Sequence, residues 1–188
     1  MKVRRVVTGH ESGKSVIRND GSPLWAKDFV HTPGFSSALV WATPSQPLIP
    51  VESKDPIASV TSFIPAPGET RLLVVTFPPD SVMASPDFNP VAAAKEQAEE
   101  CPGLVECFEP DNPGMHTTPT VDYGVVLDGE IWLELDDGTT TLLKRHDIVI
   151  QNGTRHAWRN KGTAPATLAF ILIGARRSEL IRRTQSAG

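Results

Sequence analysis

Short runs of apolar residues, each bounded by proline, glycine or polar turn residues, recur along most of the chain. The clearest runs are RRVVT, SALVWA, RLLVVTF, DYGVVL, EIWLELD, DIVIQ and ATLAFILI. Short strands between frequent turn residues are typical of antiparallel barrels and sandwiches. In EIWLELD the alternation places Ile131, Leu133 and Leu135 on one face of a strand and Trp132 and Glu134 on the other. The pattern therefore predicts an all-β protein.

One helix interrupts this pattern near residues 90–101, within the stretch FNPVAAAKEQAEECPG. Asn89 can cap the first turn, and Pro90 suits the first helical position because that position needs no backbone N–H donor. Pro102 and Gly103 are expected to end the helix.

The chain of 188 residues is long enough for one domain, which we expect to span residues 1–188. We divide it into N-terminal strands and the helix (1–104), a core of strands and tight turns (105–175) and a C-terminal tail (176–188). In the core, Asp128-Gly129 and Asp137-Gly138 each separate two strand-like runs. Asp-Gly favours two-residue hairpin turns, because both residues tolerate positive φ, so we expect a hairpin at each.

The charge and composition of the chain indicate which kinds of binding partner to expect. The 18 Lys and Arg residues are balanced by 22 Asp and Glu residues, and the sequence lacks the basic patch that marks nucleic-acid binding. No apolar run approaches the roughly 18 residues of a membrane span, and the first residues contain no apolar signal region. We therefore expect a cytoplasmic protein that binds neither nucleic acid nor membrane, with Cys101 and Cys107 reduced.

Two stretches of the core carry the candidate chemistry. In MHTTPTVDYG, alternate residues of an extended strand share one face. The polar residues expected on that face are His116, Thr118, Thr120 and Asp122. In GTRHAWRN the same alternation places His156, Trp158 and Asn160 together.

Taken together, these stretches resemble the two motifs of the cupin superfamily, and of its RmlC-like single-domain members in particular. The first family motif is H-x-H, three or four residues, E, six residues, G, and the second ends in G-x-x-H-x-x-x-N. The positions that match are His116, Gly129, Gly153, His156 and Asn160, with Asp122 at the place of the glutamate. Thr118 stands in place of the second histidine, and Gln151 in place of a proline.

The resemblance implies a cupin double-stranded β-helix, or jelly-roll, barrel with an N-terminal strand extension and one or two short helices. It also implies a small-molecule site inside the barrel, and a homodimer. The family's metal-ligand positions correspond here to His116, Asp122 and His156, which we also regard as the catalytic residues. Two histidines and a carboxylate suit a divalent transition ion, although Fe, Mn, Zn and Ni are not distinguished.

Three functions remain open on this basis. The first is a metal-assisted oxygenase, lyase or decarboxylase acting on a small organic acid or carbonyl compound. The second is a metal-free isomerase or dehydratase, in which His116 or His156 moves a proton while Asp122 holds its other ring nitrogen. The third is a non-catalytic barrel that binds a small ligand, in which Thr118 and Thr120 hydrogen-bond each other.

Substrate contacts are expected from Thr118, Thr120 and Trp158, which would line the barrel. Arg71 is a further candidate, because its guanidinium can bind a substrate carboxylate through two parallel hydrogen bonds. Its neighbour Glu69 offers an alternative, a salt bridge at the rim of the barrel.

Overall fold

The structure, a computed structural model, describes residues 3–50 and 54–178. Its strands are β1 (Arg5–Glu11), β2 (Lys14–Gly21), β3 (Trp25–Asp28), β4 (Ser36–Thr43), β5 (Thr70–Phe77), β6 (Thr120–Asp128), β7 (Glu130–Glu134), β8 (Thr140–Lys144), β9 (Ile148–Asn152), β10 (Ala157–Arg159) and β11 (Ala166–Gly174), and its α-helix is α1 (Pro90–Glu100). Short 3-10 turns lie at Pro56–Ser59, Asp80–Val82, Val105–Cys107 and Asp136–Gly138.

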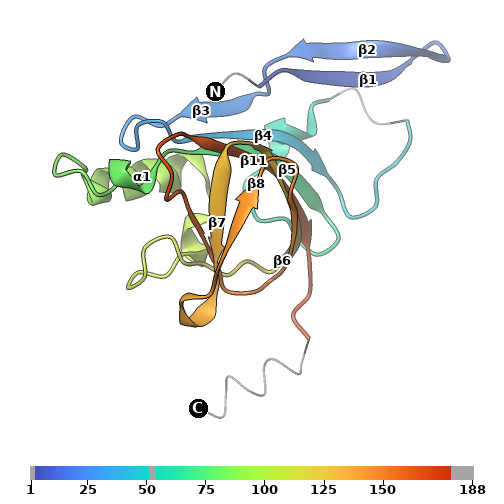
Figure 1. Cartoon of the computed structure of the whole chain (residues 1–188). Coiled ribbons are helices and arrows are strands. Elements are labelled where there is room, and N and C mark those ends of the chain that lie inside the picture. The colour runs from blue at the N-terminus through green and yellow to red at the C-terminus, as the bar shows by residue number, and fades with distance from the viewer. Residues whose placement is uncertain (1–2, 51–53, 179–188) are drawn as a thin grey trace.

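Two antiparallel sheets face each other and form the barrel (Figure 1). The larger has the strand order β3-β4-β5-β11-β6-β9, and the smaller has the order β10-β7-β8. β11 lies at the centre of the larger sheet, and its alternation directs Leu168, Phe170 and Leu172 into the core. Ile131 and Leu133 of β7 meet them from the smaller sheet. The predicted all-β barrel and the predicted inward face of EIWLELD are therefore confirmed.

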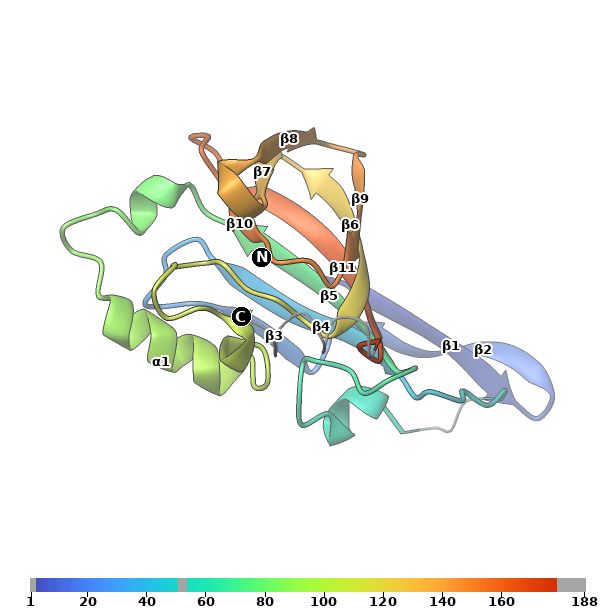
Figure 2. The same ribbon diagram turned by 90° about the horizontal axis from the view of Figure 1, so that it is seen from below.

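The helix lies at one end of the barrel, and the β1–β2 hairpin extends from the opposite end (Figures 1 and 2). As predicted, the side chain of Asn89 caps the helix, accepting a hydrogen bond of 3.1 Å from the amide of Ala92. Farther along, the Glu96 carboxylate accepts hydrogen bonds of 2.7 Å from the amides of both Val30 and His31. These bonds tie the helix to the loop that follows β3.

The two Asp-Gly turns have different roles. Asp137 and Gly138 both have positive φ, and they join β7 to its partner β8, so this predicted hairpin is confirmed. The hairpin predicted at Asp128-Gly129 is wrong, because β6 pairs with β9 and β11 whereas β7 pairs with β8 and β10. This turn carries the chain from one sheet to the other. A Cβ at Gly129 would lie 2.5 Å from the carbonyl oxygen of Pro165, so the corner requires glycine.

Within residues 3–50 and 54–178, no helix is both long enough and apolar enough to cross a membrane. Most of the tail predicted at 176–188 lies outside the described residues, which end at 178.

Candidate active site

A largely apolar cavity of about 890 Å³ lies among the strands of the barrel and helix α1. A volume of this size suits a drug-sized molecule. Its aromatic lining consists of Phe29, Phe35, Phe77, Phe88, Phe108, Phe170 and Trp158. On the wall built from the core motifs, the polar lining residues are His116, Thr118, Asp122, Gln151, His156 and Asn160. The two motifs singled out in the sequence therefore meet at one wall.

The two histidines are direct cross-strand neighbours. His116 and His156 form an isolated antiparallel bridge in which each backbone amide donates to the other's carbonyl at 2.9 Å. Residues paired in this way project their side chains to the same face. The centroids of the two imidazole rings are accordingly 4.2 Å apart, with the ring planes tilted by 49°. Because the backbone fixes this pairing, the rings stay together without any hydrogen bond between them.

Backbone carbonyls also fix the tautomer of each ring. Nδ1 of His116 lies 3.0 Å from the carbonyl oxygen of Gly114, and Nδ1 of His156 lies 2.9 Å from that of Thr154. A carbonyl oxygen only accepts, so the proton of each neutral ring is on Nδ1 and the lone pair is on Nε2. Neither Nε2 forms a hydrogen bond with a described residue.

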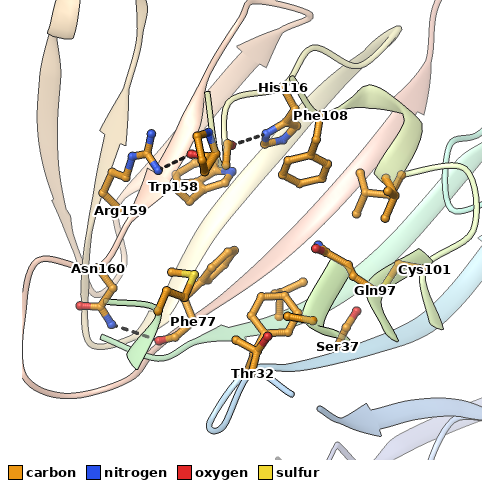
Figure 3. A pocket seen from close by; sticks show the side chains of 18 of the residues that line it. Thr32, Ser37, Phe77, Gln97, Cys101, Phe108, His116, Trp158, Arg159 and Asn160 are labelled. Carbon is orange, nitrogen blue, oxygen red and sulfur yellow. Dashed lines mark hydrogen bonds between the residues drawn. The ribbon is translucent and has the colours of Figure 1, made fainter. Parts of the chain in front are cut away.

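Burial keeps both imidazoles neutral. It lowers the pKa of His116, and it lowers that of His156 to about 4, with the neighbouring His116 as a second cause. Aromatic contacts hold the ring planes: Phe108 stacks on His116 with centroids 4.5 Å apart, and Trp158 meets His156 edge-on at 5.7 Å. Figure 3 shows His116 and Phe108 side by side at the cavity wall. At neutral pH the site therefore presents two fixed, unprotonated ring nitrogens.

The row His116, Thr118, Thr120 and Asp122 is buried along its whole length, as the alternation predicts. The Thr120 hydroxyl donates to that of Thr118 at 2.7 Å, and of these two only Thr118 is among the lining residues. Thr120 thus supports Thr118 from behind, and the structure does not place it among the residues that line the cavity, where its predicted contact with substrate would be made. The threonine pair matches the hydrogen bond expected under the binding alternative.

Asp122 stands apart from the histidines. Both Nδ1 atoms are bound to carbonyl oxygens rather than to its carboxylate, so the His–Asp pair of the metal-free alternative is not formed. Oδ1 of Asp122 is buried without a hydrogen-bond partner, and its cross-strand neighbour on β9 is Gln151. Burial raises the pKa of Asp122 to about 6. This carboxyl therefore exchanges its proton close to neutral pH.

The complete metal-ligand set of the resemblance does not fit the site. Among residues 3–50 and 54–178, no three or more His, Cys, Asp or Glu side chains are grouped so that they could hold one metal ion. The structure thus brings His116 and His156 together but does not add Asp122 to them. The two histidine rings, with centroids 4.2 Å apart, are close enough to share one ion at a bond length of about 2.1 Å.

Arg71, which was predicted to bind substrate, does not lie among the residues that line the cavity. Its guanidinium binds Glu69 at 2.9 Å and the carbonyl oxygens of Ser62 and Thr70 at 3.3 and 2.9 Å. The side chain is buried at the start of β5 with these partners. The salt bridge with Glu69 is confirmed instead.

Phe108, which lines the cavity beside His116, was not predicted from the sequence. Phe108 carries no motif, but the Asn-Pro-Gly turn between it and His116 is a signal that the two segments fold back on each other. Arg155, next to His156, binds both carboxylate oxygens of Glu109 at 2.6 and 2.7 Å and Asp136 at 2.8 Å. Its charge is thus engaged in holding the segment that leads to His116.

Similarity to known proteins agrees with this geometry. The family described as "Cupin domain" matches residues 104–173. Over 184 residues the chain is 31% identical to phomopsin biosynthesis cluster protein C' of Diaporthe leptostromiformis, an alignment that covers 94% of this chain and 80% of that protein. The chain belongs to the cupin superfamily.

A shorter similarity joins this cupin to the cupin-domain-containing oxidoreductase virC of Hypocrea virens, at 34% identity over 62 residues, or 31% of this chain and 32% of that protein. Among solved structures, the putative ethanolamine utilization protein Q of Salmonella typhimurium aligns at 9% identity over 94% of this chain and 99% of that chain, with a TM-score of 0.42.

Proposed function

We propose that this cupin is a small-molecule enzyme of the oxidoreductase type, and that its reaction centre is one divalent transition-metal ion held by His116 and His156. One observation carries the proposal: two buried neutral imidazoles are paired by the backbone at the wall of the cavity, and neither Nε2 atom forms a hydrogen bond with a described residue. Relatives named as biosynthesis cluster proteins and as cupin-domain-containing oxidoreductases support the enzyme class.

The surroundings of the rings favour a metal ligand over a general base. Imidazole nitrogen is a good ligand for Fe, Ni, Cu and Zn, and metal-bound histidines usually donate their other N–H to a carbonyl or carboxylate. Both Nδ1 atoms here face carbonyl oxygens. A general base of the His–Asp kind would instead need the carboxylate of Asp122 on one of them. Two adjacent Nε2 lone pairs also repel each other, and a shared cation removes that repulsion.

Residues around the pair prepare the site for chemistry. A metal ion bound there would supply Lewis acidity or electron transfer toward a substrate oxygen. Phe108 and Trp158 hold the rings in position. The aromatic and apolar side chains that line the cavity lower the local polarity, which strengthens electrostatic interactions beside them. Asp122, with its pKa raised to about 6, can accept a proton from the substrate and return it near neutral pH.

The cavity also revises the kind of substrate that we expect. A small organic acid would leave most of the 890 Å³ unfilled. Arg159 is the one Lys or Arg among the described lining residues, and it is occupied by Glu134 at 2.6 Å and by the carbonyl oxygen of Pro113 at 2.8 Å. We therefore propose a larger, mostly uncharged substrate.

Metal analysis by plasma mass spectrometry tests the proposal. Purified protein is equilibrated with Fe, Mn, Zn or Ni, desalted and compared with His116→Ala, His156→Ala and the control His10→Ala, whose histidine lies exposed on the β1–β2 hairpin. We expect one ion per chain in the wild type and the control, and loss of that ion in both cavity variants. Equal metal content in all four proteins would contradict the proposal, as would its absence from all four.

A further inference from the structure

A second polar group enters the cavity from helix α1, on the side away from the histidines. The helical residues that line the cavity are Pro90, Ala93, Ala94 and Gln97, followed by Cys101 at the C-terminal end. Spacings of four residues place Ala93, Gln97 and Cys101 on one helix face. Gln97 is the longest of these side chains. Figure 3 shows it pointing into the cavity, across from His116 and Trp158.

The side-chain amide of Gln97 is unpaired within residues 3–50 and 54–178. No described residue forms a hydrogen bond with its side chain, although its backbone carbonyl accepts from the amide of Cys101 at 2.8 Å. The nearby Ser37 differs, since its hydroxyl acts on the thiol of Cys101 and lowers the pKa of that thiol, against the larger effect of burial. Gln97 is only partly buried, so water can hydrate its amide until a ligand takes the place of that water. Gln97 is therefore available to a ligand.

The wall that carries this amide is fixed in place and uncharged. Glu96, one residue earlier, binds the loop amides of Val30 and His31, which prevents the helix from moving freely over the cavity. At this end of the cavity, the labelled polar residues of Figure 3 are Thr32, Ser37, Gln97 and Cys101, all neutral. An amide both donates and accepts, so it suits a hydroxyl, carbonyl or amide group rather than an ion.

Between the two polar ends the lining is aromatic. Phe29, Phe35 and Phe77 follow one another in edge-to-face contacts, with centroids 4.9 and 5.7 Å apart. Phe170 and Trp158 continue this wall toward His156, at 5.3 and 5.7 Å. Such a continuous aromatic surface suits a flat or extended apolar body.

We infer that the substrate is an elongated, mainly aromatic or apolar molecule with an uncharged polar group at each end. One end meets the His116–His156 pair, and Gln97 hydrogen-bonds the other. The reacting end rests on the proposed function, whereas the distal anchor rests on the cavity alone. Gln97 is thus a specificity residue, which selects ligands by a group far from the reaction centre.

Calorimetric titration with two simple probes tests this anchor. Para-phenylphenol has one hydroxyl, and the corresponding biphenyl diol has one on each ring; the matching stilbene mono-ol and diol provide a longer span. A neutral hydrogen bond contributes about 0.5–1.5 kcal/mol, so at least one diol should bind about threefold to tenfold more tightly than its mono-ol. In Gln97→Leu that preference should vanish while mono-ol binding persists. Glu99→Leu, an equal change on the exposed face of α1, should retain the preference.

The outcomes separate the two proposals. The anchor is overturned if neither diol is preferred by the wild type, if the preference survives in Gln97→Leu, or if no probe binds. Metal analysis is scored independently of these titrations. A metal-free protein that prefers a diol would reject the proposed function and keep the anchor, and a metal-containing protein without the preference would do the reverse.

Discussion

The two walls of the cavity are built in different ways. On the histidine wall, backbone pairing sets the position of His116 and His156, carbonyl oxygens set their tautomers, and aromatic rings hold their planes. On the helix wall, the side chains are mostly small, and the one long residue, Gln97, has a free amide. The difference suggests a division of roles. The histidines, which we propose to bind the metal, are each held by several interactions, whereas Gln97, which we propose to select the ligand, is free to change its conformation.

If this contrast is correct, substitutions on the histidine wall should change the free energy of unfolding strongly, in either direction, and those on the helix wall should change it little. The variants below compare the walls by their free energies of unfolding.

The largest effect is expected for Asn160→Ala on the histidine wall. The Asn160 side chain is 1% exposed; its amide donates to the carbonyl oxygens of Phe77 and Ala164 at 3.0 and 2.8 Å, and its oxygen accepts from the amide of Gly162 at 3.1 Å. Removing it leaves buried groups without partners, and we expect a loss of about 3 kcal/mol in urea unfolding. The exposed Asn152→Ala should change stability by less than about 0.5 kcal/mol. Similar losses of unfolding free energy in Asn160→Ala and Asn152→Ala would contradict the proposed difference between the two walls.

An intermediate and pH-dependent effect is expected for Asp122→Asn. Burial raises the pKa of Asp122 to about 6 from its ordinary value of 3.8, so folding favours the protonated form. That contribution to stability is present at low pH and is lost as pH rises through about 6. Asn carries no charge, so the variant should be more stable than wild type by about 2 kcal/mol near pH 8, and this gain should shrink toward pH 5. The exposed control Asp111→Asn should show no such trend. A gain that is the same at both pH values would count against a buried, shifted carboxyl.

The smallest effect is expected for Gln97→Leu on the helix wall. The side chain has no protein partner to lose, and leucine is at least as good a helix former as glutamine. We expect the free energy of unfolding to change by less than about 0.5 kcal/mol. Destabilisation as large as that of Asn160→Ala would mean that Gln97 is structural and not reserved for a ligand.

Much of the fold followed from patterns in the sequence. Alternation identified the inward faces of β6 and β7, and the Asn89–Pro90 pair located the start of the helix. The exposed Tyr123, next to the buried Asp122, shows how directly period-two burial follows from strand geometry.

The sequence pattern could not predict features that depend on which segments meet in three dimensions. Asp128-Gly129 has the composition of a hairpin turn, but only the sheet topology shows that it joins two sheets. Arg71 and Asp122 are each chemically suited to their predicted roles, but only the three-dimensional structure shows that Arg71 is held by Glu69 and that Asp122 is not grouped with the two histidines. Gln97 could not be identified as a cavity residue from the sequence, because that requires knowing which face of α1 lines the cavity.

The most direct test of the central claim is an anomalous X-ray difference map from crystals soaked in Zn²⁺ or Fe²⁺, recorded at the absorption edge of the soaked metal. The account predicts one peak per chain about 2.1 Å from Nε2 of both His116 and His156. No peak at the pair in either soak, or a peak bonded to only one of the two rings, would contradict it.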